Sequence, residues 1–142
     1  MFWSKKAKPS LDEIEIATHC RIEAEELYRS GKYHCAEAVM ESIRRKFSPE
    51  TAEAVVATVA GFGGGSGSGC ICGAVSGGTV ALGLVLNDKK QTTHLTRELH
   101  SWFKEKYGVT CCTIIRKEND KGVCPILTGE VAGKIAEMLE RR

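Results

Sequence analysis

The chain has 142 residues, a formal net charge of +2 and 27% charged side chains, so one domain with its own apolar core is expected. The near-neutral charge and the small number of aromatic side chains argue against binding to nucleic acid or to an anionic membrane surface. The apolar runs fall short of the roughly 20 residues that span a bilayer.

Residues 1–9 are interpreted as an N-terminal extension and residues 10–142 as one cysteine-rich helical domain. The extension carries lysines without the apolar stretch of a signal peptide, so a cytoplasmic protein is expected. Ser10 and Glu13 fit a capping box, which predicts a helix to about Ser30. Cys20 lies within this helix among apolar neighbours and is expected to be a small core residue.

Two further helices are predicted before the middle of the chain. The first runs from Tyr33 to Phe47 and places Cys35 in its first turn, either as a buried apolar contact or as a reactive thiolate. The second is expected to begin with Ser48 as N-cap and to continue to about Ala60.

A glycine-rich run, residues 61–69, then leads into Cys70-Ile71-Cys72. It matches neither the G-x-G-x-x-G nucleotide-binding pattern nor a P-loop, so a phosphate site is disfavoured. Cys72 stands where the next helix should begin, and the unpaired N–H groups and positive dipole end of a helix start favour the thiolate. The backbone N–H groups expected to surround a bound cofactor are those of Gly69, Gly73 and Ala74.

The helix predicted from Cys72 to Leu86 carries a stripe of glycines and alanines, which suits close packing of one backbone against another. We expect it to be the central helix of the molecule; the same stripe would also suit a homodimer. A polar turn should follow, then a helix from Thr92 to Tyr107, a short helical segment from Thr113 to Lys117, and a last helix with Thr128 as N-cap. The fold class predicted is therefore all-α: a single-domain bundle of about six or seven helices with a glycine-rich loop before the central one.

The seven cysteines are the main functional signal. Their number is odd and no secretory signal accompanies them, which favours metal binding or thiol redox chemistry over a disulfide framework. Apart from Cys20, each lies in a loop or at a predicted helix start: Cys35, Cys70, Cys72, Cys111, Cys112 and Cys124. Four thiolates with N–H donors nearby are what an iron–sulfur cluster requires, although the C-x-x-C spacing of zinc ribbons and common ferredoxins is absent.

Several of these residues also form a recognisable pattern. The segment 33–39, the element Cys72-Gly73-Ala74-Val75-Ser76-Gly77 behind the glycine run, and then Cys112 and Cys124 resemble the C_GCAxxG_C_C family of redox-active proteins. The resemblance implies a largely helical protein whose four signature cysteines are Cys35, Cys72, Cys112 and Cys124. A related module in split-Soret cytochromes c accompanies an iron–sulfur cluster. This chain has no C-x-x-C-H, so covalent haem attachment is not implied.

Three functions remain open at this point. The first is electron transfer, with an iron–sulfur cluster of unknown type on Cys35, Cys72, Cys112 and Cys124, and with Cys70 and Cys111 as alternate ligands. The second is metal-free thiol–disulfide chemistry, with Cys72 as nucleophile and Cys35 or Cys70 as its partner. The third is a structural zinc–thiolate module. Whether the chain is an enzyme is left open: under the first two functions it would be an electron-transfer component or an oxidoreductase, with a redox partner protein that is unknown.

Overall fold

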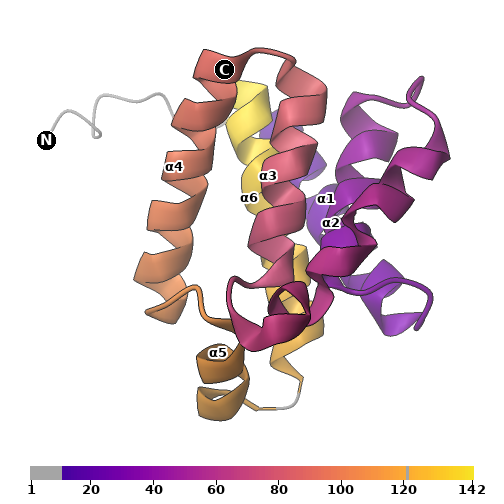
Figure 1. Ribbon diagram of the computed structural model, residues 1–142. Coiled ribbons are helices and arrows are strands. Elements are labelled where there is room, and N and C mark those ends of the chain that lie inside the picture. Colours follow the sequence, from indigo (N-terminus) through magenta and orange to yellow (C-terminus); the bar gives the residue numbers. More distant parts are fainter. Residues whose placement is uncertain (1–10, 121) are drawn as a thin grey trace, which may run out of the picture.

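The computed structural model describes residues 11–120 and 122–142, and their side chains from residue 15 onward. The predicted extension and the predicted cap at Ser10 lie outside this part of the chain. Within it the fold is all-α, as predicted, with no β-strand (Figure 1). The helices are α1 (Leu11–Arg29), α2 (Cys35–Phe47), the 3₁₀ helix η2 (Glu53–Phe62), the π-helical turn η3 (Gly65–Gly69), α3 (Gly73–Leu86), α4 (Lys89–Tyr107), α5 (Cys112–Glu118) and α6 (Val123–Arg141).

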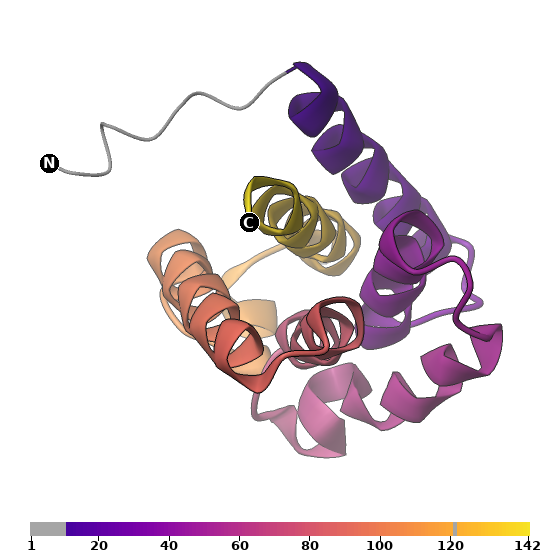
Figure 2. The ribbon, with the colours of Figure 1, turned by 90° about the horizontal axis from the view of Figure 1, so that it is seen from above.

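The long helices form a bundle around α3 and α6. Seen from above, α6 lies near the middle, with α1 and α2 on one side and α4 on the other (Figure 2). Helix α3 packs between α2 and α4, and η2 covers the outer side of α2 and α3. The short α5 lies at one end of the bundle, in contact with η3 (Figure 1).

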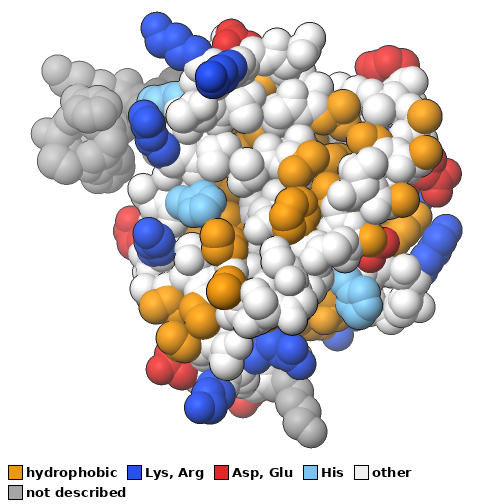
Figure 3. Space-filling view, in the orientation of Figure 1, with side chains coloured by type: hydrophobic (Ala, Val, Ile, Leu, Met, Phe, Trp, Pro, Cys, Tyr) orange, Lys and Arg blue, Asp and Glu red, His pale blue; other side chains and the backbone are white. Residues whose placement is uncertain are grey.

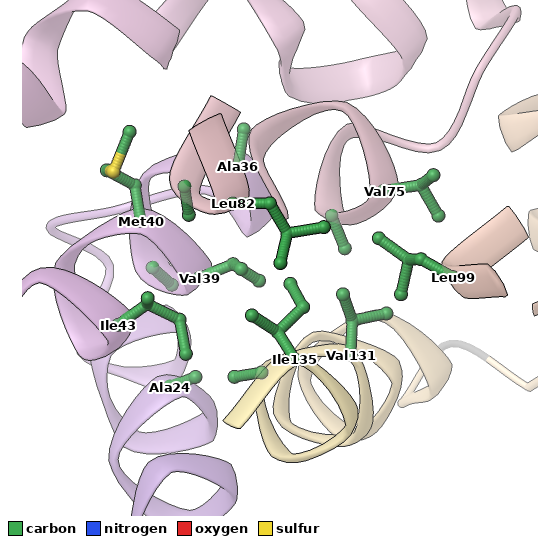
Figure 4. Close-up of a cluster of buried hydrophobic side chains, with 14 of the residues drawn as sticks. Ala24, Ala36, Val39, Met40, Ile43, Val75, Leu82, Leu99, Val131 and Ile135 are labelled. Atoms are coloured by element: carbon green, nitrogen blue, oxygen red, sulfur yellow. The ribbon is translucent and has the colours of Figure 1, made fainter. Parts of the chain in front are cut away.

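Aliphatic side chains from α1 to α6 and from η2 fill the core, as the apolar stripes predict. Figure 4 shows Val39 and Ile43 of α2 facing Ile135 of α6, with Leu82 of α3 between these helices. Each of these four side chains is 0% exposed. Cys20 is also fully buried, and burial raises the pKa of its thiol to about 11. Cys20 is therefore a core residue, as expected from its place in the sequence.

The small-residue stripe of α3 is used within the monomer. A Cβ added to Gly77 would lie 2.6 Å from the Ala36 carbonyl oxygen of α2. A Cβ added to Gly78 would lie 2.5 Å from Cδ1 of Ile135 in α6. The absence of side chains at these positions lets α3 approach both neighbours closely, which explains why glycine is kept in a helix interior.

The predicted start of the third helix is wrong. Ser48 ends α2 as its C-cap, and the Thr51 N–H donates to the Ser48 carbonyl oxygen at 3.0 Å. Pro49 therefore occupies the second position of a tight turn, which its fixed φ also favours. The following helix begins at Glu53 and is a 3₁₀ helix.

Two later helices begin earlier than predicted. Helix α4 starts at Lys89 instead of Thr92, because the Asp88 carboxylate accepts a hydrogen bond from the Lys90 N–H at 3.0 Å. Helix α6 starts at Val123 instead of after Thr128, and Pro125 lies in its first turn. Proline is tolerated there because the first N–H groups of a helix have no partner within it.

The face that Figure 3 draws has no large patch of like charge, and its lysine and arginine side chains lie mainly near the edges. Among the described residues, no helix combines the length and the apolar character needed to cross a membrane.

Candidate functional site

The four signature cysteines converge on one cavity of about 450 Å³ at the α5 end of the bundle. Each comes from a different segment: Cys35 opens α2, Cys72 caps α3, Cys112 opens α5 and Cys124 lies in the first turn of α6. The other residues that line the cavity are Tyr28, His34, Ala60, Gly63, Gly64, Gly73, Ile115, Arg116 and Leu127. Sulfur atoms that are distant in the sequence thus share one enclosed environment.

A short backbone pairing holds two of these segments together. The Cys72 N–H donates to the Thr110 carbonyl oxygen at 2.7 Å, and the Cys112 N–H donates to the Cys70 carbonyl oxygen at 2.7 Å. These bonds flank an isolated antiparallel bridge between Ile71 and Cys111. The pairing fixes the start of α5 against the start of α3, and it therefore positions Cys72 and Cys112 on the same wall of the cavity.

Glycines allow the cysteine side chains to approach the backbone. A Cβ on Gly73 would lie 2.5 Å from Sγ of Cys35, and one on Gly65 would lie 2.9 Å from Cβ of Cys112. Gly65 also adopts a φ of +67°, a conformation that other residues rarely adopt. The glycine run thus brings the backbone against Cys112, and Gly73, directly after Cys72, leaves room for the sulfur of Cys35.

The expectation that the start of α3 keeps Cys72 ionised is not supported. Burial, followed by the charge of the neighbouring Cys35 thiolate, raises the pKa of Cys72 to about 12. The backbone N–H groups of Ala74 and Val75 lower this pKa, but they do not offset the loss of solvent. Cys72 is only 6% exposed, which is why desolvation dominates.

The cysteines also influence one another. The pKa of Cys35 is raised to about 11, first by burial and then by the charges of Cys124 and Cys112, while N–H groups of Ala36 and Gly64 lower it. The pKa of Cys112 is raised by burial and by Cys124. Mutual repulsion between thiolates indicates that all four sulfurs lie within electrostatic reach of one another. In the absence of a cation the cavity therefore favours neutral thiols.

Two lining residues with polar side chains were missed by the sequence analysis. The positive charge of Arg116 lowers the pKa of Cys112. Burial followed by the charges of Cys124 and Cys35 raises the pKa of Tyr28 to about 12. Arg116 could have been found from its position four residues after Cys112, on the same face of a helix. Tyr28 had no such signal, because its spacing fits an apolar stripe.

The remaining predicted site residues lie in different places. The Ala74 N–H group lowers the pKa of Cys72, and Gly73 lines the cavity. Gly69 does not line it; its carbonyl oxygen instead faces Sγ of Cys111 at 3.3 Å. Cys70 is exposed and Cys111 is half-buried, and neither lines the cavity.

The four thiols surround a space and do not converge on one point. Within residues 11–120 and 122–142, no three or more His, Cys, Asp or Glu side chains are grouped closely enough to hold one metal ion. Four cysteines around one cavity are a donor set for a thiolate-bound metal centre.

Comparison with known proteins gives one match. A family model described as "Putative redox-active protein (C_GCAxxG_C_C)" matches residues 33–138, which include all four cysteines of the cavity. No curated protein and no solved structure matches the chain in the same comparisons.

Proposed function

Because the chain belongs to the C_GCAxxG_C_C family of redox-active proteins, we propose that it is an electron-transfer protein that holds an iron–sulfur cluster in the cavity between α2, α3, α5 and α6. The observation that carries the proposal is the convergence of four cysteines, each from a separate segment, on that one cavity. Cys35, Cys72, Cys112 and Cys124 would be the ligands. The bound cluster would supply one-electron transfer.

The residues around the sulfurs suit such a group. Nearby backbone N–H groups lower the pKa of Cys35 and of Cys72, and N–H donors beside sulfur tune the reduction potential of a cluster. Arg116 adds positive charge beside Cys112 and would offset part of the negative charge of four thiolates. Ile115 and Leu127 are buried apolar side chains that would limit access of water.

The two alternatives suit the site less well. A thiol–disulfide nucleophile needs access to its substrate, yet Cys72 is 6% exposed. Cys70, one of the two disulfide partners considered for Cys72, lies outside the cavity. A structural zinc site needs three or four ligands on one ion, and the described residues contain no group with that spacing.

Anaerobic reconstitution with iron and sulfide tests the proposal. The wild-type protein should become coloured and hold both iron and acid-labile sulfide. Substitution of serine for Cys35, Cys72, Cys112 or Cys124 should each lower the iron content by half or more. The Cys20→Ala variant, which removes a buried thiol outside the cavity, should keep wild-type iron content. A colourless wild-type protein with neither iron nor labile sulfide would refute the proposal, and one equivalent of zinc per chain would favour the structural alternative.

A further inference from the structure

Two cysteines of this chain take no part in the cavity, and the structure brings them to the same place on its outer side. Cys70 and Cys111 are the neighbours of the cavity residues Cys72 and Cys112, and neither lines the cavity. Cys70 is exposed, and Cys111 is half-buried. They are separated by 40 residues along the chain but belong to the two segments that the backbone pairing joins.

The Cys111 sulfur lies directly beside the backbone that leads into Cys70. Its Sγ is 3.3 Å from the carbonyl oxygen of Gly69, the residue before Cys70. The pairing itself consists of the 2.7 Å bonds from the Cys72 and Cys112 N–H groups on either side of the Ile71–Cys111 bridge. Facing Cα atoms in such a pair are about 4.5 Å apart and consecutive Cα atoms are about 3.8 Å apart, so the Cα atoms of Cys70 and Cys111 lie no more than roughly 8 Å apart whatever the backbone angles of Cys70. This span includes the roughly 4.4–6.8 Å range of disulfides.

The backbone also separates this pair from the cavity. Cys70 has φ −80° and ψ −102°, which is not a strand conformation, so its side chain does not follow the alternation that a regular strand would give it with Cys72. Cys112, the other near neighbour, has its Cβ against Gly65 and its side chain in the cavity wall. Cys111 is therefore the better partner for Cys70.

We infer that Cys70 and Cys111 form a reversible disulfide by exchange with low-molecular-weight disulfides, at a modification site distinct from the cavity. The exposed Cys70 thiolate attacks one sulfur of the small disulfide, which forms a mixed disulfide and releases one small thiolate. The Cys111 thiolate then attacks the Cys70 sulfur, forms the Cys70–Cys111 bond and releases the second small thiolate. The two protons lost by the protein thiols pass to the two released thiolates, the protein pair is oxidised, and the small disulfide is reduced.

This bond would join covalently the two segments that position Cys72 and Cys112. In the reduced protein two backbone hydrogen bonds span the same junction. The disulfide would therefore be a redox-dependent link between these two segments at one wall of the cavity. Its formation does not require a bound group in the cavity.

Thiol mapping after equilibration with glutathione tests the inference. The full-length protein is incubated with oxidised glutathione, quenched with acid and iodoacetamide, digested with trypsin and examined by mass spectrometry without reduction. Trypsin places Cys70 and Cys72 in the fragment 47–89, Cys111 and Cys112 in the fragment 107–116, and Cys20, Cys35 and Cys124 in other fragments. We expect a loss of two thiols per chain and a link between these two fragments that dithiothreitol reverses.

Single variants identify the two sulfurs. The link should disappear in Cys70→Ser and in Cys111→Ser and persist in Cys72→Ser and in Cys112→Ser. A link that survives in Cys70→Ser or Cys111→Ser, a link to another fragment, or retention of all seven thiols would overturn the inference. None of these outcomes depends on iron, so a failure here is distinct from a failure of the proposed cluster.

Discussion

Gly73 leaves room for the sulfur of a cavity cysteine from another helix. The hydrogen that it carries in place of a side chain leaves room for Sγ of Cys35 and for the carbonyl oxygen of Phe62, which would lie 2.5 Å and 2.6 Å from an added Cβ. The glycine after Cys72 is therefore required by the position of a sulfur from another helix. A single methyl group at this position should disturb the cavity directly.

The Gly73→Ala substitution should lower the free energy of unfolding by about 1–3 kcal/mol because the added methyl overpacks the site, and it should reduce the iron bound after reconstitution. Gly83→Ala is a matched control in the same helix, because its Cβ meets only Cγ2 of Thr92 at 3.8 Å. It should raise stability by up to about 1 kcal/mol through helix propensity. Urea unfolding and iron assays measure both. Equal iron content in the two variants would contradict the role given to Gly73.

Cys20 gives a pH dependence that is separate from the cavity. Its pKa is raised from 9.0 to about 11 by burial, so the folded protein binds its proton more tightly than the unfolded chain does. The resulting stability is fully present below pH 9 and is lost as the pH rises through about 11. For one proton, the free energy of unfolding falls by at most about 1.4 kcal/mol per pH unit.

The metal-free Cys20→Ala variant should therefore lose stability less steeply than the wild-type protein between pH 9 and 11. Urea unfolding at several pH values measures the two slopes, and the other buried thiols act equally in both proteins. Parallel plots of the free energy of unfolding against pH would show that the Cys20 thiol has the same pKa in the folded and the unfolded protein.

At the scale of helices, the apolar patterns predicted the existence and order of the elements, and the errors concern where they begin. Lys89 and Lys90 gave no sign of a helix start because positive charge is unfavourable near a helix N-terminus, yet Asp88 caps α4 there. Thr128 was predicted as the N-cap of the last helix, although α6 begins at Val123 and Pro125 lies in its first turn. In both cases more than one nearby residue could start the helix, and the predicted position was the wrong one.

Thr128 distinguishes the predicted start of the last helix from the observed one. It is 0% exposed, and within the described part of the chain its Oγ1 has no hydrogen-bond partner. Thr128→Val should therefore raise the free energy of unfolding by about 1 kcal/mol, because it replaces an unsatisfied buried hydroxyl with a methyl group of similar size. Asp88→Ala, at a true N-cap, should lower it by about 0.5–2 kcal/mol. A lower free energy of unfolding in Thr128→Val would instead favour Thr128 as a helix N-cap in solution, as predicted from the sequence.

At the scale of the whole molecule, the site could be predicted as a set of residues but not as a geometry. The placement of Cys35, Cys72, Cys112 and Cys124 at helix starts, together with the family pattern, identified the cysteines that share the cavity. The contribution of Tyr28 depends on how α1 packs, and nothing local in the sequence encodes that packing. The raised pKa of Cys72 likewise follows from burial by distant segments, while the helix start alone suggests a lowered value.

The geometry of the glycine run, residues 61–69, could not be predicted from the sequence either. Repeated glycines gave no periodic pattern, so the turn at Gly65–Gly69 and its backbone contact with Cys112 could not be anticipated. What the sequence did indicate is that this loop needs unusual backbone angles, and Gly64, Gly65, Gly67 and Gly69 all have positive φ. The loop thus helps to form the site mainly through backbone conformation and close approach.

A crystal of the anaerobically reconstituted protein, measured at the iron absorption edge, tests the shared centre most directly. We expect anomalous density inside the cavity, bonded to the sulfurs of Cys35, Cys72, Cys112 and Cys124. Iron bound elsewhere, or bound by fewer than three of these four sulfurs, would contradict the central claim that four separate segments supply one redox centre.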